Sequence, residues 1–78
     1  MKEGYLQKNS DDRFELVSEN GEYLTYFTSG SNIELFDEDE EEWLQGRIEY
    51  NHDLRDYYFY KKDDTYLKLF IGDKVRCR

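Results

Sequence analysis

Residues 43–50 read Trp43-Leu44-Gln45-Gly46-Arg47-Ile48-Glu49-Tyr50, and they form the longest strand pattern in the chain. Every second residue from Leu44 onward falls on one side of an extended backbone. The residues between them, starting at Trp43, are mostly polar or charged. Side chains of a β-strand point alternately to opposite faces, so this alternation predicts a strand with one buried face. We expect Leu44 and Ile48 in the core and Trp43 facing outward.

The same period continues on both sides of this stretch. Short runs rich in Val, Ile, Tyr, Phe and Thr alternate with turn residues roughly every ten positions, which is typical of a small all-β domain. We expect five to seven short antiparallel strands closed into an SH3-like barrel, with a hairpin turn at Asn20-Gly21 because both residues accept positive φ. Residues 66–70 fit either a short strand or one turn of 3₁₀ helix. The other expected strands cover residues 4–8, 13–18, 22–27, 32–36, 43–50, 56–61 and 74–78.

Length and composition limit the class of protein. At 78 residues the chain forms a single domain, residues 1–78. Its 19 acidic and 11 basic side chains give a net charge of −8, which argues against direct nucleic-acid binding because phosphate contacts need Lys and Arg. Charged residues make up 38% and the mean hydropathy is −1.08, values near those of disordered chains. Aromatic residues make up 18%, however, and their large buried areas are enough to close a thin core.

The sequence also predicts a compartment. The opening residues, Met1 to Gly4, are polar and show no secretory signal, and no run approaches the apolar length of a membrane span. Cys77 is the only cysteine, so no intrachain disulfide can form, and a lone thiol fits a reducing environment. We therefore expect a cytoplasmic protein that does not associate with membranes.

Several segments together resemble a known family. They are Gly4-Tyr5-Leu6, Ser29 to Leu35 (Ser-Gly-Ser-Asn-Ile-Glu-Leu), Trp43 to Tyr50, Tyr57-Tyr58 and Gly72-Asp73-Lys74-Val75-Arg76. Over nearly its whole length the chain resembles a family of small proteins of low-GC Gram-positive bacteria, the domain of unknown function fifty-three forty-eight. The resemblance implies an SH3-like barrel, often encoded on phage, plasmid or conjugative elements. It implies no activity and no site residues.

No pattern in the sequence indicates an enzyme, a cofactor site or a metal site. His52, the only histidine, lies in the expected turn Asn51-His52-Asp53 without a motif that would make it a general base. Cys77 lies between two arginines that would favour a reactive thiolate, yet its position in a strand predicts a small core residue on the same side as Val75. The acidic residues lack the spacing of a Ca²⁺ loop, and no paired Cys or His is present for zinc.

The run Asp37 to Glu42 contains six consecutive acidic residues and supports two hypotheses. On an extended chain its carboxylates would be about 3.3 Å apart, close to the phosphate spacing of about 3.4 Å along one DNA strand. An acidic protein of this kind would mimic DNA and inhibit a DNA-binding host or defence protein. Alternatively, the run is a solvated loop tip that keeps an aromatic-rich protein soluble. We favour the loop.

The surplus of aromatic residues favours a protein partner. Exposed Trp and Tyr are enriched where proteins bind one another. We expect a non-enzymatic protein-interaction module of a phage or mobile element, either a monomer or a weak homodimer, with DNA mimicry as the alternative. The basic residues gather late in the chain, which also fits a self-complementary dimer. The expected contact surface consists of Trp43, Tyr57 and Phe59 with Glu40, Glu41 and Glu42.

Overall fold

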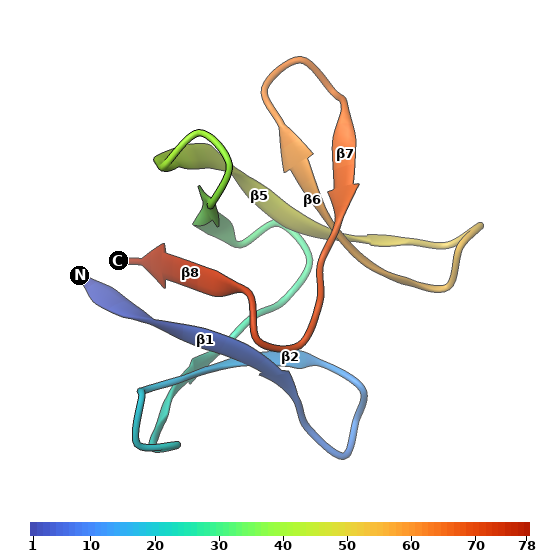
Figure 1. The fold of residues 1–78 in the computed structure, drawn as a ribbon. Coiled ribbons are helices and arrows are strands. Elements are labelled where there is room, and N and C mark those ends of the chain that lie inside the picture. The colour runs from blue at the N-terminus through green and yellow to red at the C-terminus, as the bar shows by residue number, and fades with distance from the viewer.

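The computed structural model describes all residues from Met1 to Arg78 and contains eight β-strands and no helix (Figure 1). The all-β class is therefore confirmed, with one strand more than the expected maximum. The eighth strand comes from Tyr66–Lys68, which pairs as a strand and not as a 3₁₀ turn. The strands are β1 (Lys2–Lys8), β2 (Phe14–Val17), β3 (Tyr23–Tyr26), β4 (Asn32–Asp37), β5 (Glu42–Asn51), β6 (Asp56–Lys61), β7 (Tyr66–Lys68) and β8 (Lys74–Cys77).

All eight strands belong to one antiparallel sheet with the order β3-β2-β1-β8-β4-β5-β6-β7. The first and last strands of this order, β3 and β7, do not pair with each other, so the sheet is open and its closure into an SH3-like barrel is not confirmed. β8 lies at the centre, where it pairs with β1 on one side and β4 on the other (Figure 1). It thereby joins the two groups of strands that precede it in the chain, β1–β3 and β4–β7.

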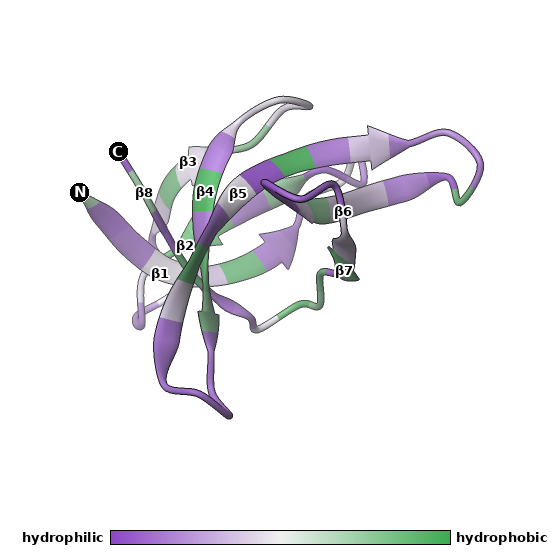
Figure 2. Cartoon of the chain, turned by 90° about the horizontal axis from the view of Figure 1, so that it is seen from above, coloured by the Kyte–Doolittle hydropathy of each residue, from purple (hydrophilic) through white to green (hydrophobic).

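One face of the sheet carries the hydrophobic core. Along the strands hydrophobic residues alternate with hydrophilic ones, as the colours of Figure 2 show. The alternation puts Leu44 and Ile48 of β5 on the core side, as expected from the sequence. The strands paired with β5 place their own core-facing residues opposite or beside these two. The buried cluster consists of Leu6, Phe14, Leu16, Phe27, Ile33, Leu35, Ile48, Phe59, Leu69, Val75 and Cys77.

Two connecting segments help the open sheet to enclose this core. The link between β3 and β4 runs beside β5, where Gly30 N–H donates to the Ile48 carbonyl at 2.7 Å and Ile48 N–H donates to the Ser31 carbonyl at 2.8 Å. The link between β7 and β8 runs beside β1, where Gly72 N–H donates to the Leu6 carbonyl at 2.7 Å. Both links also place a buried side chain in the core, Phe27 in the first and Leu69 in the second.

The hairpin turns contain strained backbone positions. A non-glycine residue has positive φ in each of four turns: Asp12, Glu41, Arg55 and Asp64, with φ between 53° and 64°. Such a left-handed residue commonly closes a hairpin loop of three to five residues. The expected tight Asn20-Gly21 turn differs, because only Gly21 has positive φ. Its loop is instead held by the Ser18 hydroxyl, which accepts hydrogen bonds from the N–H groups of Asn20 and Glu22.

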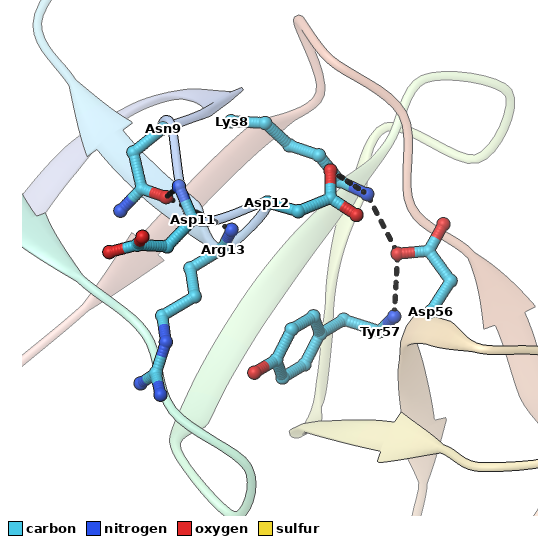
Figure 3. A network of polar contacts seen from close by, with 7 residues as sticks. All are labelled: Lys8, Asn9, Asp11, Asp12, Arg13, Asp56 and Tyr57. Carbon is cyan, nitrogen blue, oxygen red and sulfur yellow. Dashed lines mark hydrogen bonds and ion pairs between the residues drawn. The ribbon is translucent and has the colours of Figure 1, made fainter.

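An ion pair connects strands that are not neighbours in the sheet. Lys8, at the end of β1, donates to Asp56 Oδ1, at the start of β6, and Tyr57 N–H donates to the same oxygen at 2.7 Å (Figure 3). Burial favours a higher pKa for the Asp56 carboxyl, but the bonds from Lys8 and Tyr57 outweigh it and lower that pKa. Burial favours a lower pKa for Lys8, but Asp56 and Asp12 outweigh it and raise that pKa.

Candidate functional site

The structure separates the three rings that we expected to form one contact surface. Phe59 is fully buried in the core, with 0% of its surface exposed, so the prediction that it contacts a partner is wrong. The reason is register: Phe59 lies opposite Ile48 on β5 and therefore shares its inward direction. Tyr57 has the same direction two residues earlier. It is half-buried, packs against the core and makes an edge-on contact with Tyr50 at 5.1 Å between ring centroids.

Trp43 faces the opposite side of the sheet from Tyr57 and Phe59. It lies opposite Phe36, next to the inward pair Leu35 and Leu44, and alternation turns it outward as expected. Its ring is half-buried by neighbours on that outer face. Phe36 contacts it edge-on at 5.1 Å, and the Arg76 guanidinium lies 4.2 Å from its centroid. Trp43 is thus available on the outer face, but it cannot share a binding surface with Phe59.

The acidic run forms a tight hairpin turn and not an extended segment. Asp37 ends β4 and pairs with Glu42, which begins β5, so residues 38–41 form the loop between them. The Asp37 carboxylate accepts hydrogen bonds from the N–H groups of Asp39 and Glu40, and Glu41 has a φ of 53°. The predicted position of this run at a loop tip is therefore confirmed. The DNA-mimicry hypothesis assumed an extended run with evenly spaced carboxylates. That assumption is wrong, because the chain reverses within the run.

The two side chains considered for catalysis lie in different settings. His52 is exposed in the β5–β6 turn, where its ring contacts Tyr50 edge-on at 4.9 Å. Cys77 is buried beside Val75 on the core face of β8, as expected for a small core residue. Burial raises the pKa of the Cys77 thiol despite the positive charges of Lys2 and the N-terminus. No group of three or more His, Cys, Asp or Glu side chains is placed to hold a metal ion.

A surface that the sequence analysis missed lies at the open edge of the sheet, on β7 and the residues after it. Tyr66, Leu67, Phe70 and Ile71 are 50%, 39%, 58% and 69% exposed, and we call these four residues the β7 edge patch. Tyr66 lies on the outer side of β7, opposite Tyr60, and Leu67 lies on the core side, opposite Phe59, so the patch borders the open edge from both faces of the sheet. The protein exposes eight large hydrophobic side chains, and four of them lie within residues 66–71. The sequence did contain a signal. Residues 66–71 carry five apolar side chains, more than one face of a short strand can bury, and only Leu69 is buried.

β7 also offers unpaired backbone groups. It pairs only with β6, in the register Phe59 to Leu67. Lys61 N–H donates to the Thr65 carbonyl, so the alternation of an antiparallel ladder turns the N–H and C=O groups of Tyr66 and Lys68 toward the open edge. Edge strands of this kind accept an additional strand unless something covers them.

The molecule is thus a small, open, all-β domain with an acidic turn and an apolar sheet edge, and it contains no helix long and apolar enough to cross a lipid bilayer. Comparison with known families gives its membership: residues 4–77 match the model of the family described as "Domain of unknown function (DUF5348)", and the chain belongs to that family. The resemblance drawn from the sequence is confirmed. No curated protein and no solved structure gives a significant match.

Proposed function

We propose that this protein is a non-enzymatic protein-interaction module that binds an extended segment of a partner protein at β7. The observation that carries the proposal is the coincidence of the β7 edge patch with the unpaired backbone of an edge strand. A peptide added to a sheet edge gains affinity from main-chain hydrogen bonds and specificity from its alternate side chains. Here Tyr66, Leu67, Phe70 and Ile71 would supply the apolar contacts.

The magnitudes support binding at this edge. Completely burying one fully exposed large apolar side chain contributes about 1.5–3 kcal/mol. The four side chains of the patch are 39–69% exposed, so their burial offers part of this each and together still more than an exposed ion pair, which contributes about 0–1 kcal/mol. The partner segment would be extended and apolar. A carboxylate on it would also meet Lys68, whose ammonium lies 5.5 Å from the Phe70 ring. The family resemblance supports a setting on a phage or other mobile element, and the single buried thiol of Cys77 is compatible with the cytoplasm.

Capture from a lysate of a Gram-positive host, followed by affinity measurements with the purified partner, tests the proposal. Leu67→Glu with Ile71→Glu places two charges in the patch, and the control Leu54→Glu places one on an exposed leucine in the β5–β6 turn. We expect the double variant to weaken the Kd at least tenfold and Leu54→Glu to leave it unchanged. Equal binding by both variants, or no specific partner, would contradict the proposal.

A proline substitution separates strand addition from simple apolar contact. Lys68→Pro removes a backbone N–H that points away from β6, so the β6–β7 pairing should survive while an added strand loses a hydrogen bond. We expect Lys68→Pro to weaken binding and Lys68→Ala to weaken it less. DNA mimicry gives a different pattern. In that case Glu40→Gln, Glu41→Gln and Glu42→Gln together would abolish binding, and high salt alone would release the partner.

A further inference from the structure

The outer face of the β4–β5 hairpin carries three zones in a line. The acidic turn, residues 38–41, lies at one end, and all four of its residues are exposed. The ring pair Phe36 and Trp43 comes next. Beyond it lies a basic hollow. We call these three zones together the hairpin stripe.

The basic hollow has a volume of about 560 Å³ and is open to solvent. Four cationic side chains line it, Arg47, Lys62, Arg76 and Arg78, against the single carboxylate of Glu34. This local excess contrasts with the net charge of −8 for the whole protein. Glu34 pairs with Arg76, and Arg47 pairs with Glu49 at 2.8 Å. Lys62 and Arg78 are exposed and form no ion pair, so their charges remain available to a ligand.

The ring pair lies midway between the two charged zones. From the Phe36–Trp43 pair, the centre of the turn is about three residues away in one direction. The centre of the hollow, near Ile33 and Gly46, is three residues away in the other. Along the extended strands, at about 3.3 Å per residue, the centre of the hollow is about 10 Å from the rings. The four-residue turn begins directly after the Asp37–Glu42 pair, so it stands at a comparable distance on the other side. A two-fold axis that lies in the plane of the interface, perpendicular to the hairpin and between the two ring pairs, therefore brings the acidic turn of one copy onto the basic hollow of the other, with the two outer faces opposed.

We propose that the occupant of the basic hollow is the acidic turn of a second copy of this chain, in a two-fold dimer centred on Trp43. In such an interface the same patch serves both subunits, so each hollow receives one turn. The contact pairs exposed carboxylates with the free charges of Lys62 and Arg78 and buries the Phe36–Trp43 rings at the axis. The β7 edge patch lies beyond β6 and is not used. The dimer is therefore independent of the function proposed above.

A nucleic acid is the other polyanion that the hollow would admit, and the charge distribution disfavours it. A strand that follows the sheet beyond the hollow meets the acidic turn about 20 Å away along the hairpin. The remaining surface of the protein is also negative overall. The acidic turn of a second copy ends after four residues and avoids this repulsion.

Charge reversal at exposed, unpaired positions tests the dimer with little risk to folding. The hollow variant is Lys62→Glu with Arg78→Glu, and the turn variant is Glu38→Lys with Glu40→Lys. Two controls make the same changes of net charge elsewhere: Arg13→Glu with Arg55→Glu, and Glu19→Lys with Glu22→Lys. All of these positions are exposed and outside ion pairs. Sedimentation equilibrium of the full chain measures the dimer Kd for each.

We expect each reversal variant to weaken the dimer at least tenfold compared with its control, and an equimolar mixture of the two variants to restore it. In the mixed dimer both turn–hollow contacts again join opposite charges. Fluorescence of Trp43, the only tryptophan, should shift to the blue on association. A wild-type protein that stays monomeric at millimolar concentration, or a mixture that stays monomeric, would overturn the proposal. The proposal would also be overturned if the wild-type monomer bound a single-stranded oligothymidine and the hollow variant did not. Leu67→Glu should leave the dimer intact whether or not the β7 edge binds a partner.

Discussion

Lys8 Nζ lies 2.8 Å from Asp56 Oδ1 and joins β1 to β6, although three strands separate the two in the sheet. β1 and β6 do not pair through their backbones, so this ion pair is a direct link between the two sides of the open sheet. Both side chains are largely covered, with 20% and 28% of their surfaces exposed, so solvent screens the pair only in part.

Breaking this ion pair should destabilise the protein and make its stability depend on acid. A double-mutant cycle of Lys8→Met and Asp56→Asn should show a coupling of about 1 kcal/mol at pH 7 in urea unfolding. The pKa of Asp56 is lowered in the folded protein, so its contribution is complete above the unfolded value of about 3.9 and is lost as pH falls through the folded value. The exposed pair Glu3 and Lys74, 3.8 Å apart, is the control and should show almost no coupling.

Replacing Gly46 by alanine should be strongly destabilising. A Cβ at this position would lie 2.2 Å from the Tyr60 carbonyl oxygen and 2.7 Å from the Phe59 ring. The oxygen belongs to the β5–β6 ladder and cannot move without breaking it, so we expect a loss of about 2–3 kcal/mol. Thermal unfolding measures the effect. Gln45→Ala, one residue earlier and exposed, should change stability little, and an equal loss there would contradict the steric explanation.

Substitutions of Arg55 should show how much stability a non-glycine residue with positive φ costs. Its φ is 56° and its side chain makes no ion pair or hydrogen bond. Arg55→Gly should stabilise the protein by up to about 1 kcal/mol because glycine adopts positive φ without a Cβ penalty. Arg55→Ala removes the same charge but keeps the Cβ, so it should give no gain. Chemical unfolding of both variants at one pH makes the comparison, and a gain in both would point to charge instead of backbone.

The Cys77 thiol should react slowly with disulfide reagents in the native state. The thiol is buried and burial raises its pKa, so at pH 8 it is both shielded and mostly protonated. Labelling with Ellman's reagent should be far slower than for glutathione and should reach the same rate in denaturant. Rapid labelling of the folded protein would mean that the end of β8 opens readily, and it would revive a reactive role for this residue.

The sequence allowed the class of fold and most strands to be predicted because the period of two is a local property. β5 is the clearest case: the inward direction of Ile48 and the outward direction of Trp43 both follow from alternation within one strand. The acidic run was also predictable as a loop, because six adjacent carboxylates repel one another in any sheet.

The relation between strands was not predictable in the same way. Phe59 and Tyr57 were placed beside Trp43 although the register of β5 with β6 turns them to the other face, and a register depends on turn lengths that no single strand encodes. Whether the sheet closes into a barrel was not predictable for a similar reason. Whether β3 meets β7 depends on the accumulated bend of eight strands. The β7 edge patch went unnoticed because its exposure follows from that open edge.

The central place of β8 has a consequence for how the molecule reaches this state. β8 follows every other strand in the chain, yet the sheet is continuous only through its pairs with β1 and β4. During synthesis the β1–β3 meander and the β4–β7 meander emerge first and can form locally, each with one uncovered border that β8 will later fill. Contacts so distant in sequence slow folding, and uncovered strand borders promote misassembly while they last. Pairing of β8, the last of the eight strands to be synthesised, is therefore the step that joins the two meanders into one sheet.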